Sequence, residues 1–255
     1  MEPTELFSSK AEKYARFRWG YAPQLIQRIF EVTGLNNQSV VADIGAGTGI
    51  LTRHFVGRCR LVYAIEPNGP MRALAAQALG ALAGCRVLDG RAEASGLADQ
   101  SVDLITVAQA LNWFDPQPTR QEFRRILKTD GWLAAIRNVG TYSKELDAAL
   151  EAVFPKELDT TALMKGRDTP LSYYFGSQDF LQESFVSTTQ ESWEAFFGAL
   201  GTASYAPDEG SPLYEQFEQA ARQAFERFSA GGVVVSEIET QLCLGHIVKK
   251  GFISK

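Results

Sequence analysis

The feature that most constrains the fold is an apolar run at residues 40–44 that contains one acid, Asp43, and leads directly into Gly45-Ala46-Gly47-Thr48-Gly49. Short apolar runs are typical of strands that are buried on both faces of a sheet. Glycines directly after such a strand let the backbone approach a ligand, since a Cβ would stand in the way. The segment predicts a ligand-binding turn between a buried strand and a helix from about residue 48 to 56, with a tight turn that binds nothing as the simpler alternative.

The chain from residue 21 to about 139 alternates between strand-like and helix-like segments. Apolar stripes at helical spacing occur at 25–32, 71–79 and 119–127, and apolar runs that predict strands occur at 39–44, 60–65, 85–88, 102–108 and 132–136. Such alternation is typical of a parallel sheet covered by helices on both faces. In this architecture the ligand binds at the carboxyl ends of the strands.

Beyond residue 140 the helical stretches become longer, at 144–154 and 211–228, and two β-like runs occupy 180–190 and 233–248. We interpret these runs as the last two strands of a seven-stranded sheet, with residues 191–230 inserted between them as a helical lid. Polar and glycine-containing segments at 161–168 and 201–210 are the expected hinges.

Charge and cysteine content limit the classes of partner. The 25 Lys and Arg against 30 Asp and Glu give a net charge of −5, and no basic cluster is present, which argues against nucleic acid or an anionic membrane. The three cysteines are widely spaced, which argues against a disulfide framework and a zinc site and favours the cytoplasm. No apolar run reaches the roughly 18 residues that a membrane span needs, and the first residues carry acids rather than the bases of a signal peptide. A small-molecule partner is expected, while the oligomeric state stays open.

Charge also separates two classes of nucleotide ligand. A nicotinamide dinucleotide fingerprint requires a third glycine where Ile50 stands, and Asp43 would repel a bound pyrophosphate. S-adenosylmethionine carries an ammonium and a sulfonium and no phosphate, so an acid next to the glycines attracts it. Glu66 ends the second predicted strand, where a carboxylate can accept hydrogen bonds from both ribose hydroxyls. Residues 89–93 end the third, where the backbone N–H of Ala92 could contact adenine.

These segments resemble the motifs of class I S-adenosylmethionine-dependent methyltransferases, in their small-molecule, type 11-like branch. Residues 43–49 are similar to the first motif, residues 64–68 with Met71 to the second, and residues 90–93 to the third. Residues 108–115 and 123–133 are similar to the motifs at the fourth and fifth strands, so that the resemblance covers residues 40–136. It implies an α/β fold, a doubly wound Rossmann-like seven-stranded sheet with a helical cap built from the N-terminus and the insert before the last strand.

The segment 7–25 is similar to the amino-terminal segment of the trans-aconitate methyltransferase-like subgroup, in which it packs over the cofactor. This chain has Asn112 where a His is common, Arg91 where an Asp is common, and Trp19 in place of the usual proline. The resemblance divides the chain into a cap segment 1–20, a cofactor-binding core 21–140, a helix and sixth strand of the core at 141–190, the lid 191–230 and a final strand 231–255.

The resemblance also implies the site residues. The expected cofactor contacts are Tyr14, Arg18, Asp43, Gly45, Ala46, Gly47, Thr48, Gly49, Glu66, Pro67, Asn68, Met71, Arg91, Ala92, Glu93, Ala108, Gln109 and Trp113. Candidates for the acceptor pocket are Arg18, Asn112, Trp113, Arg137 and Asn138. No metal is expected and no catalytic residue is assigned, because His54 and His246 are expected to be structural.

The implied reaction is an in-line displacement at the sulfonium methyl group that leaves S-adenosylhomocysteine. A carboxylate acceptor is already ionised at neutral pH and needs no general base, whereas a hydroxyl or an amine would need one. The aromatic residues Tyr173, Tyr174, Phe196 and Phe197 are expected either in an apolar lid or in a buried helical stripe. A non-catalytic S-adenosylmethionine-binding protein that acts on a partner is the main alternative, and a nicotinamide-dependent oxidoreductase is the third.

Overall fold

The structure is a computed structural model that describes residues 7–155 and 163–248. It contains one seven-stranded sheet in the order β3-β2-β1-β4-β5-β7-β6. The strands are β1 (Val40–Ile44), β2 (Leu61–Ile65), β3 (Cys85–Leu88), β4 (Val102–Ala108), β5 (Leu127–Thr141), β6 (Leu181–Ser192) and β7 (Val233–His246). Strands β1 to β5 pair in parallel, and β7 runs antiparallel to both of its neighbours, β5 and β6. The predicted α/β Rossmann-like fold class is confirmed.

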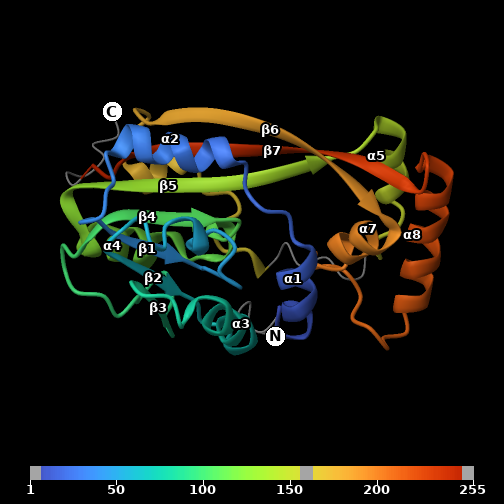
Figure 1. Cartoon of the computed structure of the whole chain (residues 1–255), viewed down its shortest axis with the longest axis horizontal. Coiled ribbons are helices and arrows are strands. Elements are labelled where there is room, and N and C mark those ends of the chain that lie inside the picture. The colour runs from blue at the N-terminus through green and yellow to red at the C-terminus, as the bar shows by residue number, and fades with distance from the viewer. Residues whose placement is uncertain (1–6, 156–162, 249–255) are drawn as a thin grey trace.

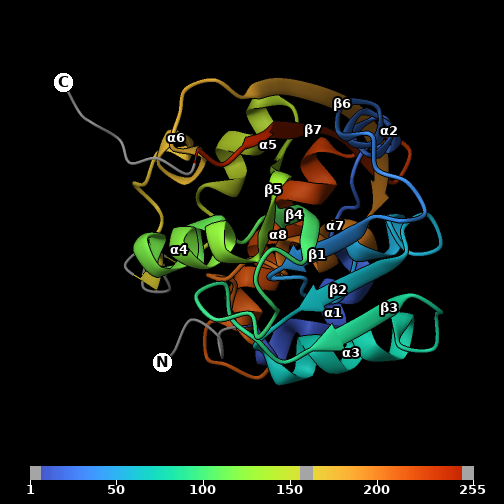
Figure 2. The same ribbon diagram turned by 90° about the vertical axis from the view of Figure 1, so that its left-hand side faces the viewer.

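Helices cover both faces of the sheet, as Figure 2 shows. On one face lies α2 (Pro23–Thr33), whose first helical position is a proline and whose C-cap, Gly34, has a left-handed φ of 68°. Its buried residues Leu25, Ile26 and Ile29 pack with Val41 and Leu104 of the sheet. This face therefore has a continuous apolar layer, as the helical stripe predicts.

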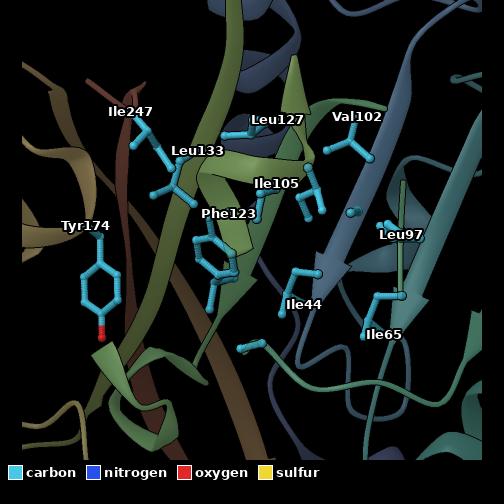
Figure 3. Close-up of a cluster of buried hydrophobic side chains, with 14 of the residues drawn as sticks. Ile44, Ile65, Leu97, Val102, Ile105, Phe123, Leu127, Leu133, Tyr174 and Ile247 are labelled. Atoms are coloured by element: carbon cyan, nitrogen blue, oxygen red, sulfur yellow. The ribbon is translucent and has the colours of Figure 1, made fainter. Parts of the chain in front are cut away.

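The opposite face is covered by α4 (Pro116–Ile126) and α6 (Leu171–Phe175). Phe123 of α4 and Tyr174 of α6 are fully buried with Ile44, Ile105 and other sheet residues in one cluster (Figure 3). Tyr174 is thus a residue of the sheet core, whereas its neighbour Tyr173 is exposed. The lid interpretation is wrong for Tyr174, because α6 packs directly on the sheet.

The predicted helix at residues 48–56 is reduced to a single 3-10 turn, η3 (Thr52–His54). Gly47 and Gly49 have left-handed φ values of 58° and 82°, which an α-helix cannot include. The first regular helix along this edge is α3 (Gly69–Leu79), where Asn68 caps the N-terminus by accepting a hydrogen bond from Met71 N.

A helical cap lies beyond the carboxyl edge of the parallel strands, at the right of Figure 1. Strands β5, β6 and β7 continue into it, and it contains α5 (Lys144–Leu150), α7 (Trp193–Leu200) and α8 (Tyr214–Phe228). These helices share an apolar cluster of their own, which includes Leu146 of α5, Phe196 of α7 and Phe217 of α8. The sequence-based division placed α5 in the sheet core, but its buried side chains pack with α8. Phe196 is buried in this cluster and Phe197 is half-buried against it, so both belong to the apolar stripe of a packed helix.

The N-terminal segment connects this cap to the rest of the protein. The 3-10 helix η2 (Ser8–Lys10) and α1 (Ala11–Phe17) contact α3, and α1 also contacts α7. The ring of Phe17 lies against Gly198 of α7, where any Cβ would collide with it. No helix within the described ranges is both long and apolar enough to cross a membrane.

Candidate active site

The glycine-rich turn after β1 is fixed by the neighbouring strand β2. The backbone N–H groups of Gly45 and Ala46 donate to the carbonyl of Ile65, at 2.9 and 3.1 Å. Gly45 has a φ of 71°, and a Cβ on it would lie 2.7 Å from the Cβ of Ala110. Glycine is therefore required here both by the backbone conformation and by the close approach of the segment after β4.

Glu66, directly after β2, is oriented by two backbone amides. Its Oε2 accepts a hydrogen bond from Gly47 N at 2.8 Å, and its Oε1 accepts one from Asn68 N at 2.9 Å. The residue is only 8% exposed, and burial raises the pKa of its carboxyl although both amides oppose the shift. The carboxylate is thus held rigidly at the edge of a cavity between the N-terminal segment and the sheet.

This first cavity lies at the carboxyl ends of β1 to β4. Most of the expected cofactor contacts line it, namely Tyr14, Gly45, Gly47, Glu66, Pro67, Asn68, Met71, Arg91, Ala92, Glu93, Ala108, Gln109 and Trp113. Four further lining residues, Phe7, Ala110, Phe114 and Lys165, were not predicted. Ala110 and Phe114 lie within the motif segment 108–115 and Phe7 begins the segment 7–25, whereas Lys165 lies in a distant loop without a recognisable motif. Asp43, Ala46, Thr48 and Gly49 do not line the cavity.

Asp43 lies beneath the glycine turn and is almost completely buried. Its two carboxylate oxygens accept hydrogen bonds from the hydroxyls of Thr52 and Thr106, at 2.6 and 2.8 Å. Burial raises its pKa to about 6. Asp43 therefore braces the turn from below, and any effect on a ligand acts through its charge instead of a direct contact.

A second cavity of about 620 Å³ adjoins the first, and it is large enough for a small organic ligand. The two cavities share Phe7, Tyr14, Gln109, Ala110 and Trp113 as walls. All five candidates for the acceptor pocket line this second cavity: Arg18, Asn112, Trp113, Arg137 and Asn138. Arg18 contributes to this cavity and does not line the first.

The charged side chains that line the second cavity are all basic. The lining includes Arg18, Arg137 and Arg167 and, within the described ranges, no Asp or Glu. Arg18 donates to the hydroxyl of Thr202 at 3.2 Å, and none of the three arginines forms an ion pair with a described residue. Arg167 was missed because it lies in a loop without periodicity or motif. The cavity is suited to an anion.

Comparison with known proteins identifies the segment that carries the glycine turn. Residues 42–135 match a family model described as a methyltransferase domain. This segment is a methyltransferase domain. An uncharacterised methyltransferase of Mycobacterium tuberculosis is 36% identical to this chain over 132 residues, which are 52% of this chain and 51% of that protein. One from Schizosaccharomyces pombe is 27% identical over 168 residues, 62% of each chain.

The chain thus spans about half the length of the curated relatives that it matches first, and the similarity centres on the methyltransferase domain. Solved structures extend the similarity in fold to most of the chain. A protein of Anaeromyxobacter dehalogenans assigned as a type II methyltransferase superposes with a TM-score of 0.64 at 21% identity, covering 92% of this chain and all of that one. The YcgJ protein of Bacillus subtilis superposes with a TM-score of 0.54 at 18% identity, covering 87% and 98% of the two chains.

Two polar residues connect neighbouring segments beside the cavities, Gln109 directly after β4 and Asn138 within β5. Asn138 donates from Nδ2 to Gly20 O at 2.8 Å, and its Oδ1 accepts from the Thr240 hydroxyl at 2.7 Å. Gln109 has a left-handed φ of 59° and donates from Nε2 to Asn138 O at 2.9 Å. Asn138 thus braces the cavity wall, although the sequence suggests an acceptor contact for it.

The two histidines lie away from both cavities. His246 packs on the ring of Trp132 with centroids 3.8 Å apart, and its Nδ1 is 3.1 Å from Gly131 O. His54 belongs to η3, where burial lowers its pKa. Among the described residues of the methyltransferase domain and the cap, no cluster of three potential metal ligands is found.

Proposed function

We propose that this protein transfers a methyl group from S-adenosylmethionine to the oxygen of a small anionic acceptor. The observation that carries the proposal is the pair of adjoining cavities, of which the second is lined by three arginines and, among the described residues, by no acid. Two sites that share a wall allow a donor and an acceptor to meet at the partition. The methyltransferase domain supplies the donor half of this arrangement.

The residues of the first cavity fit the proposed cofactor. Glu66 presents a carboxylate that two backbone amides already hold in place, as a ribose diol requires. The cavity is also lined by Glu93, Arg91 and Lys165, so that acidic and basic side chains both face the ligand. When bound, S-adenosylmethionine supplies an electrophilic methyl group on a positively charged sulfur.

In the expected reaction the protein has to align the acceptor oxygen with the methyl group and to keep water away from it. A carboxylate oxygen of the acceptor forms the new O–CH₃ bond with its lone pair, while the S–CH₃ bond breaks and its electron pair stays on sulfur. The products are a methyl ester and S-adenosylhomocysteine, and no proton is transferred. The described lining of the second cavity offers no histidine or carboxylate as a general base, which favours an acceptor that is already ionised. Phe7, Tyr14 and Trp113 would exclude water at the partition.

The test is a screen of small carboxylic acids, phenols and amines for release of S-adenosylhomocysteine, followed by kinetics of the best substrate. Arg18→Lys, Arg137→Lys and Arg167→Lys should each raise the acceptor KM by about 10- to 100-fold, because lysine cannot reproduce a paired contact with a carboxylate. Arg86→Lys, on the exposed edge strand β3, serves as the control and should leave KM unchanged. Turnover of amines alone, or a substrate indifferent to all three variants, would contradict a carboxylate acceptor.

Other outcomes distinguish the alternatives. Binding of S-adenosylhomocysteine without turnover across the panel would favour a non-catalytic binding protein that acts on a partner. Tight binding of NAD without any response to S-adenosylhomocysteine would favour an oxidoreductase. The three free thiols, Cys59, Cys85 and Cys243, fit our proposal of a reducing cytoplasmic environment, which subcellular fractionation would test.

A further inference from the structure

A buried ammonium group joins the N-terminal segment to the helical cap. Lys10 of η2 is only 5% exposed, and its Nζ donates to the backbone carbonyls of Ala203, Ser204 and Ala206 at 2.9, 3.3 and 2.6 Å. Burial lowers the pKa of Lys10, and the nearby carboxylate of Asp208 partly opposes this shift, whereas Lys13 adds to it. A buried charge is costly unless it is hydrogen-bonded, and three backbone carbonyls converge on the ammonium of Lys10.

Two of the three carbonyls that Lys10 contacts, those of Ala203 and Ser204, belong to a wall of the second cavity, and the third, of Ala206, directly follows this wall. Thr202, Ala203, Ser204 and Tyr205 line this cavity and do not line the first. The wall follows α7 and consists of turns. Its backbone conformation therefore depends on contacts with distant residues such as Lys10. The sequence suggests a hinge at 201–210, but in this structure the segment is anchored by a residue almost two hundred positions away.

The same N-terminal segment also contacts the first cavity. Phe7 and Tyr14 line it, and the hydroxyl of Ser8 accepts a hydrogen bond from Asn68 Nδ2 at 2.9 Å. Asn68 in turn donates its backbone N–H to Glu66, the expected ribose ligand. The turn η2 therefore contacts the cofactor side through Ser8 and the acceptor wall through Lys10.

We infer that Lys10 is a positioning residue that couples occupancy of the first cavity to the order of the segment 202–206, which carries the acceptor wall at 202–205. The inference rests on the proposed function, since it assigns the two cavities to cofactor and acceptor. A ligand in the first cavity packs against Phe7 and Tyr14 and immobilises η2, and Lys10 then fixes the carbonyls of the wall. An acceptor that binds afterwards meets a wall that is already ordered, so cofactor binds first and each ligand strengthens the binding of the other.

The experiment measures amide hydrogen exchange of residues 202–206 with and without S-adenosylhomocysteine as the probe, and therefore needs no acceptor. In the wild-type protein the probe should slow exchange of this wall by about fivefold or more, although the wall does not line the first cavity. Lys10→Met should abolish this slowing while the protein still binds the probe. Lys10→Arg, which keeps a charged donor, should restore part of it.

Lys13→Met is the matched control. It removes an ammonium from the neighbouring helix α1 that contacts Glu209 at 3.2 Å and the hydroxyl of Tyr214 at 3.5 Å, neither of which lines a cavity. The slowing of exchange at 202–206 should persist in this variant.

If Lys10→Met does not fold, the wild-type comparison decides alone. Probe binding without slowing in the wild-type protein, or equal slowing in Lys10→Met, overturns the coupling and leaves the proposed function intact, whereas absence of probe binding overturns the proposed function itself.

Discussion

Glu66 is the residue whose geometry bears most directly on cofactor binding. Both of its oxygens accept hydrogen bonds from backbone amides. These bonds fix the orientation of the carboxylate at the edge of the first cavity. We predict that Glu66→Ala weakens binding of S-adenosylhomocysteine by about 1–3 kcal/mol, because charge-assisted hydrogen bonds to the ribose are lost. Glu66→Gln, which keeps one acceptor oxygen, should show a smaller loss. Titration calorimetry on folded variants measures both, and an unchanged Kd in Glu66→Ala would refute the role.

Asp43 leads to a prediction about stability and pH. Its pKa in the folded protein is about 6, above the value of about 3.9 for an unfolded aspartate. The folded state therefore binds the proton more tightly, so this contribution to stability is complete below about pH 3.9 and is lost as pH rises through about 6. The difference in unfolding free energy between wild type and Asp43→Asn should fall by about 2–3 kcal/mol from pH 4 to 7.

Urea unfolding of both proteins at several pH values checks this prediction, because groups common to both cancel in the difference. A difference in unfolding free energy that stays constant, or that rises with pH, would show that burial does not raise the pKa of Asp43.

At this scale the sequence predicts which residues end a strand but not which way their side chains point. Glu66 and Gly45 lie at strand ends and line the first cavity, as expected from the carboxyl edge of a parallel sheet. Asp43 is at an equivalent place, yet two threonine hydroxyls hold it below the turn. Arg167 and Lys10 carry no local signal, because Arg167 belongs to no motif and the carbonyls that Lys10 contacts lie almost two hundred positions away.

The packing of α1 on α7 yields a prediction at the scale of elements. Gly198 of α7 lies against the ring of Phe17, and a Cβ there would overlap the ring. Helix propensity alone favours alanine over glycine by about 1 kcal/mol. Since overpacking costs about 1–3 kcal/mol, we predict that Gly198→Ala is nevertheless destabilising or at best neutral.

Chemical denaturation measures the change in unfolding free energy for Gly198→Ala. Gly201→Ala at the end of the same helix is the control, because a Cβ there would meet its nearest atoms at an ordinary 3.5 Å. A Gly198→Ala variant that gains the full helix-propensity increment would show that α1 does not pack closely on α7.

Elements with a strong hydrophobic pattern were predicted well, and the exceptions have physical causes. The strands of the core follow from apolar runs that have few alternatives when both faces are buried. The helix at 48–56 was wrong because left-handed glycines in the turn override the apolar pattern that follows. The location of α5 could not be predicted, because an amphipathic helix reveals that it has a buried face but not which neighbour covers it.

The whole molecule consists of a sheet core with two apolar layers and a helical cap with a third, connected by long strands and by the N-terminal segment (Figure 1). Both cavities are bordered by this segment, and the wall at 202–205 belongs to the cap side. The fold therefore places the first cavity, our proposed cofactor site, next to a second cavity that the cap helps to line and that we propose for the acceptor. The sequence motifs indicate most of the first cavity and the core side of the second, where Asn112 and Trp113 lie, but not the cap side, because the cap carries no motif of its own.

Titration calorimetry with S-adenosylhomocysteine and, separately, with NAD tests the central claim most directly. The account predicts a single site with a Kd in the range of about 1–100 μM for S-adenosylhomocysteine, which corresponds to about −8 to −5.5 kcal/mol, and no heat of binding for NAD. Tight binding of NAD together with no response to S-adenosylhomocysteine would contradict it.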